Sequence, residues 1–132
     1  IDVDVPSLVL GTGLGPIPVN SPGGFVPACA PAGVNHEVFY ESTLTPAWHI
    51  VATEFGHMEL LDPDYLATCL VCSTCKSGSF ERPDVLDAAD FSDFAAGLLA
   101  TFFRGALQGE VEAWDNLDSL DPRRVQISLE SR

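Results

Sequence analysis

The sequence predicts an α/β fold, because short apolar runs and a long amphipathic segment alternate along the chain. Two runs, Val3–Leu10 and Ala47–Thr53, are apolar at nearly every position, which is typical of parallel strands buried on both faces. A third segment, Asp90–Gln108, carries apolar residues at helical spacing. Strands joined by a long connection and followed by a helix indicate a parallel sheet with helices packed on it.

The first strand is expected over Val3–Leu10 and leads into a glycine-rich segment, residues 11–15. A dinucleotide fingerprint would need a further glycine at its sixth position and a helix directly after it. Pro16 stands there instead, so we interpret these glycines as a tight turn at the rim of the sheet. Abundant Pro, Gly and Ser predict a loop from Gly15 to Pro31.

A short helix is expected over Val34–Ser42, with Asn35 as its N-cap and with Val38 and Phe39 facing inward. The second strand, Ala47–Thr53, follows. Two parallel strands joined by so long a connection imply a right-handed crossover. Two such strands do not make a self-sufficient sheet, so the missing strands are expected from chain outside these 132 residues or from a partner.

Two more helices are expected towards the C-terminus. Asp62-Pro63 is a typical helix start, for a helix running to about Val71. Asp90 is expected to cap the strongest helix, and Gly109 suits its exit. The apolar stripe of that helix consists of Phe91, Phe94, Ala95, Leu98 and Phe102. Beyond Trp114 the chain is polar and capable of fraying, and its sequence gives no further structural signal.

The composition limits the classes of molecule that the protein is expected to bind. The chain has 132 residues, with 19 acidic and 6 basic side chains and a formal charge of −13. Nucleic acid is disfavoured as a partner because phosphate backbones are bound by Lys and Arg, and anionic membrane surfaces are disfavoured for the same reason. The longest apolar block, Phe94–Phe103, is about half of the ~20 residues that span a bilayer, so no transmembrane segment is expected.

Three cysteines form a C-x2-C-x2-C pattern at Cys69, Cys72 and Cys75. An iron–sulfur motif would need a fourth cysteine where Ser79 stands, and zinc would need a fourth ligand from Cys29 or a histidine. We therefore expect no metal, and a local disulfide or free thiols in a surface loop. The pairing cannot be read from the sequence. A metal-binding module centred on these cysteines is the weakest of the alternatives.

The histidines differ in context. We interpret His36 as a residue of the helix-capping region bonded to a neighbouring carbonyl, and His49 as a satisfied residue of the second strand. His57 follows Gly56 at the carboxyl end of that strand, where α/β enzymes gather their catalytic groups. In α/β hydrolases the chain order is Ser, then Asp or Glu, then His, with the His before the last long helix. His57 has that place relative to Asp90–Gln108, which indicates a catalytic base.

The other members of such a site are not evident. A nucleophile elbow reads G-x-S-x-G, and the chain has no such segment. The serines that lack this context include Ser7, Ser21, Ser42, Ser73, Ser77 and Ser79. By proximity in sequence the acid candidates are Glu37, Asp62 and Asp64, but none directly follows the first strand. The serine, and with it the acid, are therefore expected upstream.

Several segments together resemble plant and algal chlorophyllases. They are Val9–Gly15, Pro27–Pro31, Gly33–Tyr40 and Phe55–Asp62, with the cysteine-rich stretch ending in Lys76-Ser77-Gly78 and the apolar helix ending near Gly109 in the same order. The likeness covers roughly residues 5 to 109. It implies the C-terminal part of an α/β-hydrolase domain over residues 1–109, comprising the last parallel strands, the catalytic-His loop and the final helix. An acidic tail over residues 110–132 would follow.

The resemblance implies a serine carboxylesterase of chlorophyll catabolism, acting in the chloroplast without a cofactor on the phytyl ester of chlorophyll or a related phytylated porphyrin. The family's triad histidine maps onto His57, whereas its serine, in a G-H-S-x-G-G elbow, and its aspartate map upstream of Ile1. The chain alone is then expected to be inactive and to need the N-terminal remainder of the domain. No substrate-binding residue is assigned, although the loop Gly15–Pro31, with Phe39 and Tyr40, is a hypothetical border for an apolar groove. The alternative is a non-catalytic fragment that binds pigment or a partner.

Overall fold

The structure is a computed structural model that describes residues 5–60, 75–77, 88–120 and 125–132. Its elements are β1 (Ser7–Thr12), β2 (Val19–Ser21), β3 (Gly24–Val26), α1 (His36–Ser42), β4 (Ala47–Ala52), the 3₁₀ helix η1 (His57–Leu60), α3 (Ala88–Gln108), α4 (Val111–Asp118) and β5 (Ile127–Ser131). The mixed α/β content agrees with the class that the sequence predicts. The helix expected from Pro63 to about Val71 lies outside the described residues, as do Cys69 and Cys72.

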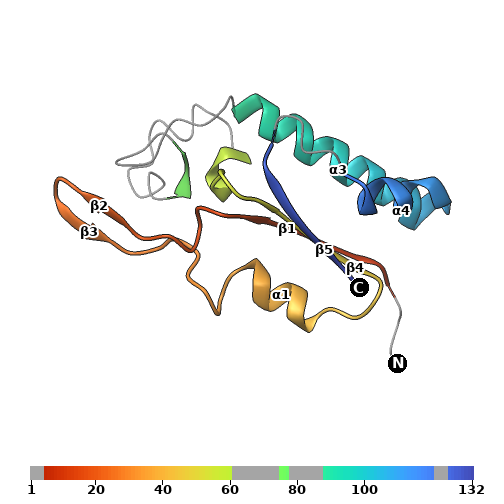
Figure 1. Ribbon diagram of the computed structural model, residues 1–132, viewed down its shortest axis with the longest axis horizontal. Helices are drawn as coiled ribbons and strands as arrows, with labels where there is room; N and C mark the ends of the chain where they lie inside the picture. Colours follow the sequence, from red (N-terminus) through yellow and green to blue (C-terminus); the bar gives the residue numbers. More distant parts are fainter. Residues whose placement is uncertain (1–4, 61–74, 78–87, 121–124) are drawn as a thin grey trace.

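The main sheet has the strand order β1-β4-β5 in the described part of the chain. β1 and β4 are parallel, with Ser7 opposite Ala47 and Thr12 opposite Ala52, which confirms the parallel pair. β5 runs antiparallel along the other side of β4 and pairs Ser131 with Trp48. The carboxyl ends of β1 and β4 meet at one end of the sheet, and the β2–β3 hairpin and η1 lie at that same end (Figure 1).

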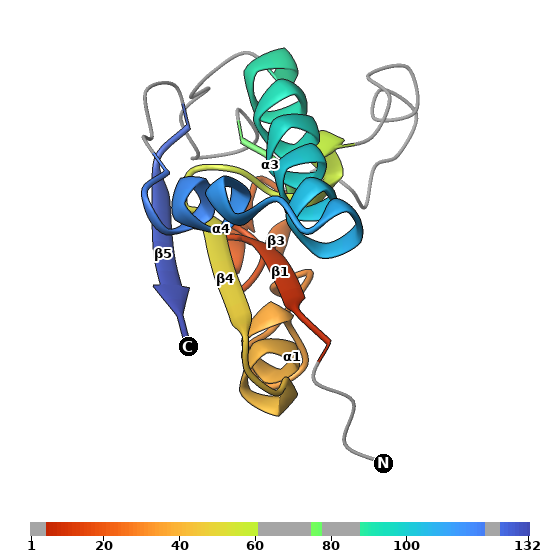
Figure 2. The ribbon, with the colours of Figure 1, turned by 90° about the vertical axis from the view of Figure 1, so that its right-hand side faces the viewer.

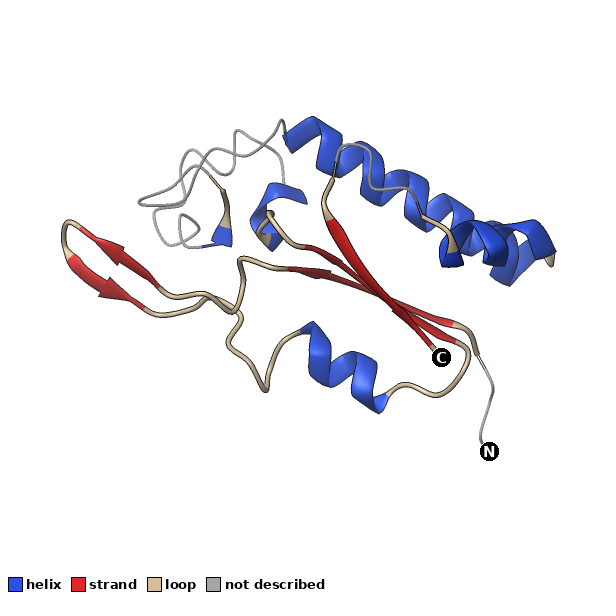
Figure 3. Cartoon of the chain, viewed as in Figure 1, coloured by secondary structure: helices blue, strands red, loops and turns tan. Residues whose placement is uncertain are grey.

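Helices cover the two faces of this sheet (Figures 2 and 3): α3 and α4 lie on one face and α1 on the other. Successive side chains of a strand point to opposite faces. Trp48 and Ile50 therefore face the long helix and form a buried cluster with Leu98 and Leu117. His49 faces α1.

The apolar stripe of α3 faces the sheet as expected. Phe91, Ala95 and Leu98 are buried, and Phe94 and Phe102 pack against the same core. The helix begins at Ala88, so Asp90 lies in its first turn and is not its cap. Gly109 follows with φ of +69°, a left-handed conformation that favours glycine at a helix exit.

The described part of the polar tail is structured and does not fray. The residues beyond Gly109 form α4 and β5, and both contribute to the core. Trp48 stacks on Trp114 with ring centroids 4.9 Å apart, and the Trp48 indole N–H donates to Asp118 at 2.8 Å. The tail looked polar because β5 carries apolar side chains only at alternate positions, Ile127 and Leu129, and covers an edge of the sheet.

The helix α1 confirms Asn35 as its N-cap, whose side-chain oxygen accepts the Glu37 N–H at 3.1 Å. Its predicted inward face is wrong: Phe39 is 65% exposed, whereas Tyr40 is 8% exposed. A helix of two turns presents one narrow line to the sheet, and residues four apart share it. His36 and Tyr40 form that line, and both rings contact His49.

The segment from Gly15 to Pro31 is not only loop. β2 and β3 pair as an antiparallel hairpin around Pro22 and Gly23, with Val19 opposite Val26. In Figure 1 this hairpin projects beyond the carboxyl end of the sheet. Only three residues of each strand pair, which is too short for an alternation of polar and apolar residues to reveal it in the sequence.

Candidate functional site

His57 begins η1, five residues after Ala52, the last paired residue of β4, and its side chain is exposed. The preceding residues fix its place. Phe55 is fully buried and stacks on Phe91 of α3 with centroids 4.6 Å apart. Gly13 N–H donates to the Ala52 carbonyl at 2.8 Å, which ties the ends of β1 and β4 together. The structure therefore places an exposed imidazole at the carboxyl edge of the parallel pair.

Gly56 has to be glycine, because a Cβ built there would lie 1.7 Å from the carbonyl oxygen of Cys75 and 2.1 Å from its carbonyl carbon. Both atoms belong to the backbone and cannot rotate away. The segment Cys75–Ser77 thus packs directly against the turn that carries His57.

Glu59 joins these two segments. Its carboxylate is 5% exposed and accepts the Gly56 N–H at 2.7 Å, while its second oxygen accepts the Ser77 hydroxyl. A buried carboxylate with both oxygens hydrogen-bonded is a strong local constraint. Sequence reasoning missed this role. The available signal was a lone acid between Met58 and Leu60, in an otherwise apolar stretch after the histidine.

A disulfide links Cys29 to Cys75, across a sequence separation of 46, so the expectation of a local disulfide or a free thiol is wrong for Cys75. The bond fastens the base of the β2–β3 hairpin to the segment beside Gly56. It also brings Cys29 Sγ to 3.9 Å from His57 Nδ1.

The ligand atoms of Cys29, His57 and Cys75 lie within 4.8 Å of one another. Metal ions bind the thiolate form of cysteine, however, and here the two sulfurs are bonded to each other. The donor set in this arrangement does not fit a metal.

In the described part of the chain, none of the serines or acid candidates considered from the sequence is bonded to His57. No carboxylate there is hydrogen-bonded to its ring. Glu37 lies on α1 and lines a different cavity, and Asp62 and Asp64 lie outside the described residues. Ser77 is bonded to Glu59, and Ser7 donates to the Val5 carbonyl at 3.3 Å.

His36 and His49 form a separate pair on the α1 face of the sheet. His36 Nδ1 and His49 Nε2 are 2.8 Å apart, so the partner of His36 is an imidazole and not the expected carbonyl. His49 is buried and bonded, as expected for a satisfied strand residue. Burial lowers its pKa below the ordinary 6.5, and nearby His36 lowers it further, while Glu130 and Glu37 oppose the shift.

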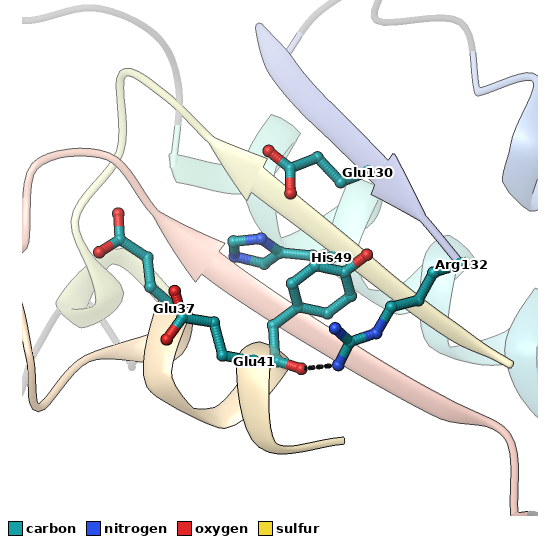
Figure 4. A pocket seen from close by; sticks show the side chains of 6 residues that line it. Glu37, Glu41, His49, Glu130 and Arg132 are labelled. Carbon is teal, nitrogen blue, oxygen red and sulfur yellow. Dashed lines mark hydrogen bonds between the residues drawn. The ribbon is translucent and has the colours of Figure 1, made fainter. Parts of the chain in front are cut away.

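A cavity of about 280 Å³ opens beside His49 (Figure 4). Its lining residues are Glu37, Tyr40, Glu41, His49, Glu130 and Arg132. The guanidinium of Arg132 donates to the Thr43 carbonyl at 2.6 Å and stacks over the Tyr40 ring at 4.5 Å. Arg132 thereby ties the end of β5 to the end of α1, and His57 is not among the residues that line this cavity.

Comparisons with known proteins agree with one another. A family model described as Chlorophyllase matches residues 1–131. Chlorophyllase-2 of Arabidopsis thaliana is 37% identical over 116 residues, which cover 83% of this chain and 32% of the relative. Chlorophyllase-1 of the same plant is 34% identical, with 83% and 31% covered. The protein of Citrus unshiu named "Chlorophyllase-1, chloroplastic" is 31% identical, with 98% and 37% covered.

The chain therefore spans about a third of the length of the curated relatives it matches. Among the described residues no helix is both long enough and apolar enough to cross a membrane.

Proposed function

Because this chain belongs to the chlorophyllase family, we propose that the protein containing it is a carboxylic ester hydrolase that cleaves the phytyl ester of chlorophyll to chlorophyllide and phytol. The observation that carries the proposal is His57, an exposed imidazole held at the carboxyl end of β4 by Gly56 and the buried Glu59. The chain would form the C-terminal part of an α/β-hydrolase domain, and α4 and β5 would be included because they pack in the same core as β1 and β4.

In the proposed mechanism His57 is the general base. With the proton on Nδ1, Nε2 takes the hydroxyl proton of a serine as that serine attacks the ester carbonyl. The same nitrogen then returns that proton to the departing phytol oxygen, which leaves the chlorophyllide acyl group bonded to the serine. In the second half His57 takes a proton from a water that attacks this acyl group and returns it to the serine oxygen, so that chlorophyllide is released. The exposure of the ring supports this assignment, since a base has to reach a substrate.

The serine and the orienting acid would come from the N-terminal remainder of the domain. Two observations support this step: the sequence contains no G-x-S-x-G segment, and the chain spans about a third of its relatives. β1 forms one side of the sheet order β1-β4-β5, so the remaining strands could add beside it. On this proposal the 132 residues alone are inactive.

The test uses the complete protein, and its readouts are chlorophyllide release and labelling by a fluorophosphonate, which reacts with activated serines. His57→Ala should lower turnover by roughly 10⁵–10⁶-fold and abolish labelling. His49→Gln is the matched control: that ring lies on the α1 face, bonded to His36, so turnover per folded molecule should stay within a few-fold of the original. Full turnover in His57→Ala would refute the base assignment.

A protein that binds chlorophyll without hydrolysis would take up pigment yet show neither product nor label, so the same assay separates the non-catalytic alternative. No observation specifically favours that alternative, and we do not propose it. The relatives from Citrus carry the word chloroplastic in their names, which supports the chloroplast as the proposed location. The proposed chemistry needs only side chains, substrate and water, and therefore no cofactor or metal.

The two aromatic residues expected to border the hypothetical groove beside Gly15–Pro31 differ in their exposure. Tyr40 is buried against His49, whereas Phe39 is exposed on α1. Phe39 is the residue that could contact a phytyl chain. We expect Phe39→Ala to raise KM in the complete protein with little change in kcat, and an unchanged KM would count against the groove.

A further inference from the structure

We propose that the β2–β3 hairpin, residues 16–27, docks the protein on a lipid surface of no net charge. The first observation is charge. The chain has 19 acidic and 6 basic residues, yet residues 5–35 contain no Asp, Glu, Lys, Arg or His. Burial of a charge in an apolar medium is strongly unfavourable, so a segment without one is suited to contact with lipid.

The second observation is the exposure of apolar side chains along the projecting hairpin. Phe25 of β3 is 70% exposed, and Ile17, just before β2, is 49% exposed. The hairpin projects away from the helices and the sheet in Figure 1, so these side chains are not simply the rim of the core. An aromatic and an aliphatic side chain on a protruding hairpin can reach the boundary between headgroups and acyl chains.

The third observation is the state of the backbone polar groups at the tip. The Ser21 hydroxyl accepts the Gly23 N–H at 3.2 Å and donates to the Gly24 carbonyl at 3.0 Å. Residues 16, 18, 22 and 27 are prolines and have no N–H to satisfy. Because unpaired backbone groups are what make lipid contact costly, this tip is prepared for shallow insertion. A two-stranded hairpin still has open edges, so the depth stays at the interface.

The charge of the chain favours an uncharged or zwitterionic lipid surface over an anionic one. The formal net charge of −13 would be repelled by an anionic surface. The hairpin is also fixed to the candidate site: Ala30 N–H donates to the Gly15 carbonyl at 3.0 Å, and the Cys29–Cys75 disulfide lies beside the His57 ring. A surface held at the tip would therefore lie on the same end of the sheet as His57.

The experiment measures flotation of the complete protein with phosphatidylcholine vesicles that contain no chlorophyll. Phe25→Asp should lower the vesicle-bound fraction about tenfold, and Ile17→Asp should lower it by a smaller factor. The matched control is Leu107→Asp. Leu107 is 79% exposed near the end of α3, which lies at the other end of the molecule from β2 and β3, so binding should not change. Replacing about a third of the lipid with phosphatidylglycerol should weaken binding of the original protein.

A second variant keeps the test decisive if Phe25→Asp folds poorly. Phe25→Trp should show a blue shift of the added tryptophan emission with phosphatidylcholine vesicles, after subtraction of the original protein's spectrum. Equal flotation of Phe25→Asp and the original protein, or no emission shift, overturns the proposal. The proposal is also overturned if the original protein does not bind vesicles and Phe25→Asp lowers Tm or dissociates a dimer. In that case the hairpin is covered by the remainder of the protein or by a second copy of it. No chlorophyll is present, so these outcomes leave the proposed hydrolysis of its phytyl ester untouched.

Discussion

Replacing Gly56 with alanine tests how the site is held, because the structure makes this glycine the contact between the His57 turn and the Cys75 backbone. The added Cβ would lie 1.7 Å from the Cys75 carbonyl oxygen and 2.6 Å from Lys76 N. One of the two backbone segments has to move. Overpacking of this kind costs about 1–3 kcal/mol, and weakening the Gly56 bond to the buried Glu59 carboxylate adds a comparable loss.

We therefore expect Gly56→Ala to lower the free energy of unfolding by about 3 kcal/mol or more, measured by urea denaturation of the complete protein. Since a displacement of 1 Å at a catalytic group can cost about a hundredfold, turnover should fall by roughly that factor even in the fraction that folds. The measurement is kcat for ester hydrolysis, corrected for folded protein.

Gly97→Ala is the matched control. Nothing lies within 4 Å of a Cβ at Gly97, in the middle of α3, so alanine should stabilise that helix by about 0.5–1 kcal/mol and leave kcat unchanged. The same Gly→Ala change should therefore lower the free energy of unfolding at position 56 and raise it at position 97. Stability of Gly56→Ala within about 0.5 kcal/mol of the original, together with full turnover, would refute the reasoning.

Three further perturbations test other contacts. Cys29→Ser removes the disulfide that closes a loop across a sequence separation of 46. In denaturation without reductant it should lower the free energy of unfolding by about 4 kcal/mol. An equal difference between variant and original protein in the presence of reductant would contradict a disulfide origin. The lowered pKa of His49 means that the unfolded chain binds more protons, so stability should fall as pH drops below about 6.5; His49→Gln should flatten that slope in Tm measurements. Trp114→Ala removes the ring stacked on Trp48 and should cost about 3–5 kcal/mol in urea, whereas Leu107→Ala, at an exposed site, should cost little.

The parts of the fold predicted from the sequence are those with a strong periodicity. The runs that became β1 and β4 are apolar on both faces, and α3 repeats its apolar stripe over 21 residues. Asn35 was found because a cap is a local interaction within a few residues. In each case the signal lies inside one element and needs no knowledge of its neighbours.

The features that were missed depend on distant partners. β5 is recognisable only by its pairing with β4, since its own pattern is short and mostly polar. The Cys29 pairing could not be chosen from four cysteines without the approach of the hairpin to Cys75. Likewise His36 was expected to bond a carbonyl, because the sequence does not reveal that Gly11 leaves room for its ring beside His49.

The position of His57 follows from both kinds of information. The sequence alone places a histidine after a buried strand, which many non-catalytic loops also do. The structure adds that the turn is clamped from two directions, by Glu59 within η1 and by the Cys75–Ser77 segment bonded to the hairpin base. Ordinary surface loops are not constrained in this way, because an exposed side chain gains nothing from an exact position. A clamped backbone beneath an exposed imidazole is expected where the ring has to meet a partner at fixed geometry, and this is the physical reason to look for the nucleophile within reach of Nε2.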